Sequence, residues 1–165
     1  MDLRRFLRHV AMTPWTAASR FPSAALDAIA KAIGDGEKTH RGQVRFVVEA
    51  ELGTAQLWVD RNSRERAREV FAMTGVWDTE ENSGVLVYVL LADRKVEIVA
   101  DRGIQERVTA DEWQAICGAM ETAFRQGRFE AGAVEGVRAI SVLLARHFPS
   151  RGEHPNELPD RPILL

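Results

Sequence analysis

The fold is decided by the stretch WDTEENSGVLVYVLLADRKVEIVADRGI at residues 77–104. Within it, residues 85–91 are all apolar or aromatic, and a strand that is apolar on both faces belongs in the middle of a covered sheet. After a short polar turn, residues 95–101 largely alternate between apolar and charged, which is typical of a strand near a sheet edge. The short turn between the two strands predicts an antiparallel hairpin.

The hairpin also predicts a polar corner at one end of the sheet. If Leu91 faces Val96, then Asp101 returns beside Leu86 and Gly84 and meets the acidic loop 78–83. Carboxylate and amide oxygens on loops suit Ca²⁺ or Mg²⁺ better than zinc or copper. In a second interpretation these side chains bind no ion: they are solvent-exposed loop residues, and some of them stabilise turns. Spacing alone favours this second interpretation. The candidate metal ligands are Asp78, Glu80, Asn82 and Asp101.

Length and composition exclude several classes of protein. The chain has 165 residues, of which 45% are hydrophobic and 28% charged, and this fits one globular domain. No apolar run is long enough to span a membrane, and the first ten residues lack the apolar core of a signal peptide, so we expect a cytoplasmic protein. The net charge of −2, without a basic patch interleaved with aromatic residues, argues against a nucleic-acid partner.

A second strand is expected to reach the same corner. Residues 43–50 have a strand pattern, and a helix that begins at Asn62 or Ser63 connects them to the central strand. Such a β-α-β unit has a right-handed crossover and parallel strands, so Gln43 would arrive at the corner. The corner would then lie at the amino ends of two parallel strands, although ligands of parallel sheets usually bind at the carboxyl ends.

Three more helices are expected around the sheet. One covers residues 23–33 and ends at Gly34, where a C-terminal cap belongs. Another begins at Thr109, which opens a capping box, and the last covers about residues 130–147. Cys117, the single cysteine, falls in the apolar stripe of the helix after Thr109, so we interpret it as a core residue and not as a nucleophile.

The two ends of the chain differ from its middle. We expect a helix and a connection at residues 1–20, the main domain at 21–149 and a proline-rich tail at 150–165. The first helix is amphipathic and basic, so it would lie on an anionic membrane or, more commonly for such a helix, dock on its own domain. The tail is either disordered or an extended strap on the surface. The apolar side of the first helix holds Leu3, Phe6, Leu7 and Val10.

The usual catalytic motifs are absent from the sequence. There is no glycine-rich phosphate loop, no His-Glu-x-x-His helix, no pair of cysteines and no nucleophile elbow. The four histidines, which also lack the spacing of metal ligands, are His9, His40, His147 and His154.

Four short motifs resemble one known family: RGQVRF at 41–46, NSGVLVY at 82–88, ADRKVEI at 92–98 and DRGI at 101–104. They are similar to the TPM domain, which is named for a thylakoid lumen protein, a photosystem II repair factor and a nematode receptor modulator. The Glu-Trp pair after Thr109 and the HFP motif after the last helix match its short, cytosolic bacterial form. The tail motif NELPDRP resembles one proteobacterial subgroup.

The resemblance implies an α/β fold with a definite architecture: a three-layer α/β/α sandwich around a mixed, mainly parallel sheet with an antiparallel hairpin. It also implies a divalent-cation site, usually associated with calcium, on loops at one end of the sheet. The acidic loop of the family matches Asp78, Glu80 and Asn82, and its Asp-Arg-Gly motif begins at Asp101. Many members have glutamate where this chain has Gln43, which would be a neutral ligand or a structural hydrogen-bonding group. Accessory positions are Gln43, Arg102 and Asp93.

Two functions from different classes remain open. The first is a non-catalytic module whose cation-dependent corner docks on a protein partner, since other members of the family help to assemble or repair membrane complexes. It would be cytoplasmic, peripheral to a membrane, without a transmembrane segment. The alternative is a metal-dependent acid phosphatase, an activity attributed to plant members, in which Arg102 would hold the phosphate and Asp101 or Asp78 would act as ligand or base. A site that has lost its ion, as Gln43 suggests, is a third possibility.

Overall fold

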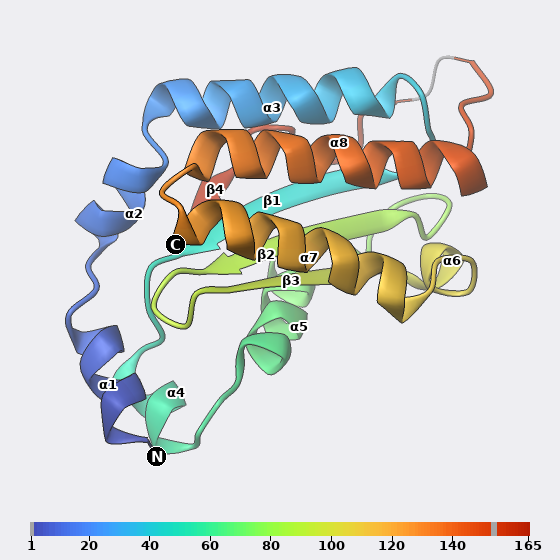
Figure 1. Ribbon diagram of the computed structural model, residues 1–165. Coiled ribbons are helices and arrows are strands. Elements are labelled where there is room, and N and C mark those ends of the chain that lie inside the picture. The colour runs from blue at the N-terminus through green and yellow to red at the C-terminus, as the bar shows by residue number, and fades with distance from the viewer. Residues whose placement is uncertain (1, 153–154) are drawn as a thin grey trace.

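A four-stranded mixed sheet forms the middle of the molecule, as Figure 1 shows in a computed structural model that describes residues 2–152 and 155–165. The strand order is β3-β2-β1-β4. β1 is parallel to both β2 and β4, whereas β2 and β3 form an antiparallel hairpin, so the predicted sheet is confirmed. The strands are β1 (Gln43–Glu49), β2 (Gly84–Leu90), β3 (Lys95–Ala100) and β4 (Ile163–Leu164).

The central position of β2 follows from its sequence. Each of its residues is buried, and successive side chains alternate between two separate hydrophobic clusters, one on each face of the sheet. β3 is the edge strand, as predicted. Its register differs from the prediction, because Val96 faces Val89 and not Leu91. A shift of two residues leaves each side chain on its predicted face, so Asp101 still returns to Gly84.

Helices cover both faces of this sheet, which confirms the three-layer α/β/α architecture. On one face lie α2 (Pro14–Arg20), α3 (Ser23–Glu37), α7 (Ala110–Arg125) and α8 (Phe129–His147). On the other lie α5 (Ser63–Met73) and the short α4 (Thr54–Trp58). Two further short helices are α1 (Leu3–Val10) and α6 (Arg102–Gln105). None of the helices within 2–152 and 155–165 has the length and hydropathy needed to cross a membrane.

The predicted helix starts are confirmed by their capping contacts. The Asn62 side chain accepts a hydrogen bond from Glu65 N at 2.8 Å, and the Glu65 carboxylate accepts one from Asn62 N at 3.2 Å. Thr109 and Glu112 exchange the same pair of bonds at the start of α7. These reciprocal contacts satisfy backbone donors that a helix cannot satisfy itself, which is why the local sequence was sufficient to place both helices.

The predicted end of α3 at Gly34 is wrong, because the helix continues to Glu37. Gly36 is needed for packing: a Cβ built there would overlap with Ser141 Oγ on α8. Gly136 has the same role on α8, since a Cβ there would overlap with the Met120 side chain on α7. From the sequence alone, a glycine that allows two helices to pack closely cannot be distinguished from a glycine that ends a helix, because the neighbouring helix is not known.

The C-terminal tail is a strap, the second of the two forms considered for it. β4 pairs with Val47 and Val48 of β1, and Leu165 N donates to Val48 O at 2.8 Å. Leu158 is buried on the α5 face of the sheet. Residues 153 and 154, which belong to the predicted tail and include one of the histidines, lie outside the described residues.

Candidate cation-binding corner

Three segments of the chain meet at the predicted corner. Gln43 and Gly84 are paired on adjacent parallel strands, and Asp101 N donates to Gly84 O at 2.8 Å. The three residues therefore form a row across the sheet. Because side chains alternate along each strand, those of Gln43 and Asp101 lie on the α5 face, with Gly84 between them.

The loop at 78–83 is fixed to its neighbours on both sides. Ser83 N donates to Thr79 Oγ1 at 2.9 Å, which closes the loop on itself. Gly103 N donates to Asn82 O at 3.1 Å, which ties the loop to α6. On the other side Arg41 forms an ion pair with Glu81, and the Ser83 hydroxyl donates to Arg41 O.

Asp101 has one carboxylate oxygen engaged and one that is not. Oδ1 accepts a hydrogen bond from Arg102 N at 2.7 Å and so caps the first turn of α6. Oδ2 is buried and has no hydrogen-bond partner in the part of the chain that the structure describes. A buried polar atom without a partner costs about 1–3 kcal/mol, and more if it is charged. Asp101 Oδ2 is therefore an acceptor at the corner that a cation or a hydrogen-bond donor could satisfy. Gln43 Nε2, in the same row, is a buried donor without a partner among the described residues.

A backbone oxygen lies next to this row of residues. A Cβ built on Gly84 would overlap with the carbonyl oxygen of Val76, so this oxygen occupies the space above Gly84 between Gln43 and Asp101. At Gly103, likewise, a Cβ would lie 2.9 Å from Glu81 O and 2.8 Å from Asn82 O. Glycine at both positions lets carbonyl oxygens approach the corner, and such oxygens are common ligands of Ca²⁺.

Gln43 has a partner that the sequence did not reveal. Its side chain is fully buried, and Oε1 accepts hydrogen bonds from Glu157 N at 2.7 Å and Leu158 N at 3.0 Å. The Glu157 carboxylate in turn accepts a bond from Glu80 N at 2.8 Å. The tail thus crosses the corner, and Gln43 holds it there. Glu157 and Arg41 were missed because their contacts join distant segments; the signals were the family-like motifs at 41–46 and in the tail.

The remaining predicted ligands reach the corner but do not converge on one point. Asp78, Glu80 and Asn82 are exposed, and their side chains make no hydrogen bond or ion pair with other described residues. The same is true of the Arg102 guanidinium. Within the described ranges, no three side chains of His, Cys, Asp or Glu are grouped so that they could hold a metal ion. The donors present are hard oxygens, which fit Ca²⁺ or Mg²⁺ in kind, but the carboxylates do not form a closed cage.

Asp93 does not belong to the corner, contrary to our assignment of it as an accessory residue. It lies in the β2–β3 turn, at the opposite end of the antiparallel hairpin, where it binds α1. Arg5 Nη2 donates to its carboxylate at 2.8 Å, and His9 Nε2 lies 3.1 Å from it. His9 Nδ1 accepts a bond from Leu52 N, so Nε2 carries the proton. Burial raises the pKa of Asp93, but the bonds from Arg5 and His9 outweigh it and hold this pKa below its usual value.

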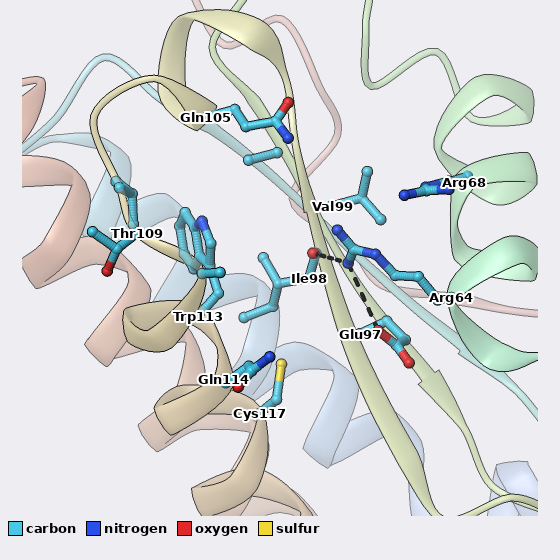
Figure 2. A pocket seen from close by; sticks show the side chains of 13 residues that line it. Arg64, Arg68, Glu97, Ile98, Val99, Gln105, Thr109, Trp113, Gln114 and Cys117 are labelled. Carbon is cyan, nitrogen blue, oxygen red and sulfur yellow. Dashed lines mark hydrogen bonds and ion pairs between the residues drawn. The ribbon is translucent and has the colours of Figure 1, made fainter.

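A cavity of about 790 Å³ lies elsewhere, along the exposed edge of β3 between α5 and α7 (Figure 2). Arg64 of α5 reaches β3, where it donates to Ile98 O and pairs with Glu97 at 3.7 Å. Cys117 faces the cavity, but burial raises the pKa of its thiol to about 12, so it is protonated at neutral pH. Arg64 thus covers a carbonyl of the edge strand, as natural edge strands require.

Comparisons with known proteins agree with this fold. The family model of the TPM domain matches residues 16–143. The solution structure of the BA42 protein from Bizionia argentinensis superposes with a TM-score of 0.72 at 30% identity, covering 86% of this chain and 93% of that one. The N-terminal domain of a protein from P. gingivalis superposes with a TM-score of 0.64 at 19% identity, covering 80% and 82%, which shows the fold alone. No curated protein matches this sequence significantly. The chain therefore belongs to the TPM domain family.

Proposed function

We propose that this TPM domain is a non-catalytic module that binds a divalent cation, Ca²⁺ or Mg²⁺, at the corner around Asp101. We propose further that it acts in the assembly or maintenance of a membrane-associated complex. The observation that carries the proposal is Asp101 Oδ2, a buried carboxylate oxygen without a partner among the described residues. A bound cation would satisfy this atom without any change in the strands that position it.

The donor set indicates a weak and open site. Asp101 would provide the first ligand, and Asp78, Glu80 and Asn82 lie on the adjoining loop with exposed, unengaged oxygens. Gln43 would support the site indirectly, because its oxygen already holds the tail. Since no three acidic side chains of the described chain are grouped for a metal, water or a partner's oxygen would complete the coordination. Open sites of this kind bind Ca²⁺ with a Kd of roughly 10⁻⁴–10⁻³ M.

The groups around the corner favour binding over catalysis. The two hydroxyls of the loop, Thr79 and Ser83, are both buried and both engaged in hydrogen bonds that shape the loop. His9 lies at the other end of the sheet and uses both of its ring nitrogens for structure. A cation that is completed by a partner's oxygen would instead make docking at the corner dependent on the ion.

A metal-dependent phosphatase is the alternative, and one observation favours it. Arg102 is exposed beside Asp101 and is not engaged by another described side chain, so its guanidinium is available to bind a phosphate. Hydrolysis of p-nitrophenyl phosphate with Ca²⁺ or Mg²⁺ tests this function. Turnover that is lost in Arg102→Gln and Asp101→Asn, but kept in the surface control Arg138→Gln, would replace the proposal of a non-catalytic module.

Chemical-shift mapping of the ¹⁵N-labelled chain tests the cation site. On titration with CaCl₂ to about 10 mM, we expect saturable shifts confined to residues 76–84 and 101–103. These shifts should disappear in Asp101→Asn and persist in Glu135→Gln, which removes an exposed carboxylate on α8. Saturable shifts that survive Asp101→Asn, or none with either Ca²⁺ or Mg²⁺, would overturn the proposed site.

A further inference from the structure

The first helix docks on the domain through its polar side. Arg5 and His9, one turn apart on α1, point into the molecule and bind Asp93. Phe6 packs beside them against the cluster on the α5 face. His9 is 1% exposed, so the polar side of α1 is the side that the domain covers. A basic amphipathic helix would ordinarily bury its apolar side instead.

The apolar side of α1 is left open to solvent as a result. Leu3, Leu7 and Val10 follow the i, i+4, i+7 spacing of one helix side, and each is more than half exposed. Three large aliphatic side chains on one short helix form an apolar stripe that nothing in the described chain covers. A stripe of this kind, bordered by charges, is typical of a surface that binds a partner or a membrane.

A second exposed apolar group lies next to this helix. Arg5 donates to Arg61 O and pairs with Asp60 at 3.4 Å, which fastens α1 to the segment just after α4. At the end of α4, Trp58 is 71% exposed and Val59 is similarly open. Figure 1 shows α1 and α4 together at the N-terminal end of the molecule. Ten large hydrophobic side chains are exposed in the described chain. Six of these ten lie in residues 3–15 and 58–59.

The charges beside the stripe indicate what covers it. Arg4 and Arg8, again one turn apart, lie on the side of α1 between its apolar stripe and its docked side. The Arg4 guanidinium makes no ion pair with any residue that the structure describes. Arg8 lies 3.7 Å from the Asp93 carboxylate, but its side chain is still half exposed. Exposed aliphatic residues, a tryptophan and exposed arginines form the combination that lies in the interface of an anionic bilayer.

We propose that α1 and the end of α4 form a peripheral membrane-binding surface. Leu3, Leu7 and Trp58 enter the boundary between lipid headgroups and acyl chains, and Arg4 and Arg8 bind lipid phosphates. Asp93 holds α1 in this orientation from the other side. The surface is distinct from the cation-binding corner and does not depend on it, although it would bring the module to the membrane where we propose that it acts.

Co-sedimentation with lipid vesicles tests this surface. The chain is mixed, in EDTA, with vesicles of phosphatidylcholine or of about 70% phosphatidylcholine and about 30% phosphatidylglycerol; we expect binding to the anionic vesicles alone, weakened by salt. Arg4→Gln with Arg8→Gln should weaken binding roughly tenfold or more, because each arginine contributes about 1 kcal/mol near an anionic surface. Because EDTA removes divalent ions, failure here is distinguishable from failure of the cation site.

Matched variants separate the stripe from general hydrophobicity. Leu3→Gln with Leu7→Gln should abolish binding, whereas Val142→Gln should not change it; Leu3 and Val142 are both 65% exposed, but Val142 lies on α8. Trp58→Ala should weaken binding more than Trp77→Ala. Thermal melting checks that each variant is folded, since none of these residues is buried. Absence of binding to anionic vesicles, or equal loss in Val142→Gln, would overturn the proposal and leave a protein partner as the cover for α1.

Discussion

The two ends of the central sheet both carry acidic residues, but at one end most of these residues are paired with basic residues and at the other end most are not. At the carboxyl ends of β1 and β2, Glu49 binds Arg66 at 2.7 Å and Asp93 binds Arg5 at 2.8 Å. At the amino ends, Asp78 and Glu80 have no side-chain partner among the described residues, and Asp101 has one carboxylate oxygen that is buried and unpaired. Acids that are neutralised within the chain stabilise the fold, whereas acids left unpaired are available to a ligand.

The contrast reverses the usual rule for parallel sheets, in which ligands bind at the carboxyl ends of strands. Here that end is filled by α1 and by the contacts of Glu49, which also accepts a hydrogen bond from the buried Tyr88. Burial, together with the negative charge of Glu49, raises the pKa of this tyrosine, so it remains a donor. Glu51 is the exception at this end, because its Oε2 is also buried without a partner in the described chain.

The largest effect is expected from Glu49→Ala, which removes the carboxylate between Arg66 and Tyr88. The variant leaves the largely buried Arg66 with only the weaker partner Glu69 and removes the acceptor of Tyr88, so it should lower the free energy of unfolding by about 3–4 kcal/mol. Urea denaturation measures this loss. The control is Glu69→Ala on α5, which removes a partly exposed carboxylate that pairs with both Arg66 and Arg61. It should cost less than about 1 kcal/mol. Equal losses in the two variants would contradict a structural role specific to the carboxyl end.

Asp93→Asn should have the next largest effect. The amide keeps the shape of Asp93 but loses the charge that Arg5 and His9 bind, so we expect a loss of about 2 kcal/mol. Hydrogen exchange should show faster exchange in α1 than in β2. If α1 kept its protection, another contact would hold the helix and the role given to Asp93 would be wrong.

The same residue predicts a dependence of stability on acid. Because the folded pKa of Asp93 is held below its unfolded value, its contribution is present above the unfolded pKa and is lost as the pH falls through the folded pKa. Below about pH 4, the difference in unfolding free energy between the native chain and Asp93→Asn should therefore shrink. Urea titrations between about pH 6 and pH 2 would measure the difference; a gap that widens in acid would refute this sign.

Gln43→Glu tests whether a cation bound at the corner influences the stability of the chain. The new carboxylate can still accept both backbone bonds from the tail, but it adds a buried charge on the same face as Asp101. Without a cation we expect a loss of about 1–2 kcal/mol, and with Ca²⁺ we expect this loss to be recovered. Thermal melting with and without Ca²⁺ measures both. A loss that Ca²⁺ does not reduce would place Gln43 outside the influence of any bound ion.

Sequence reasoning succeeded where the signal was local. The central strand, the helix starts at Asn62 and Thr109 and the meeting of Gln43 with Asp101 all follow from periodicity, caps and crossover handedness. Asp101 was placed correctly in spite of a register error, because a shift of two residues preserves the face.

The features that the sequence did not predict are contacts between distant residues. Arg5 and Asp93 are 88 positions apart, and no local pattern shows that a helix will dock by its charged side. Gln43 and Glu157 are 114 positions apart, so no local pattern predicts that the tail crosses the corner. The end of α3 was placed at Gly34, before Gly36, because the residue that requires glycine at position 36 is Ser141 on another helix, α8. Likewise, the sequence cannot predict that an oxygen of Asp101 is unpaired, because this depends on every residue that surrounds it in the fold.

Paired thermal melts of Asp101→Ala and Asp93→Asn, each with and without about 10 mM CaCl₂, test the contrast between the two ends most directly. For a Kd near 10⁻³ M, the native chain should gain about 1.4 kcal/mol of stability from Ca²⁺. Asp101→Ala loses the cap of α6 together with the unpaired oxygen, so without Ca²⁺ its stability should stay within about 1 kcal/mol of the native chain, and it should gain nothing from Ca²⁺. Asp93→Asn should be less stable and gain as much as the native chain. If Asp101→Ala kept the gain from Ca²⁺, or if Asp93→Asn lost it, the corner would not be the cation site.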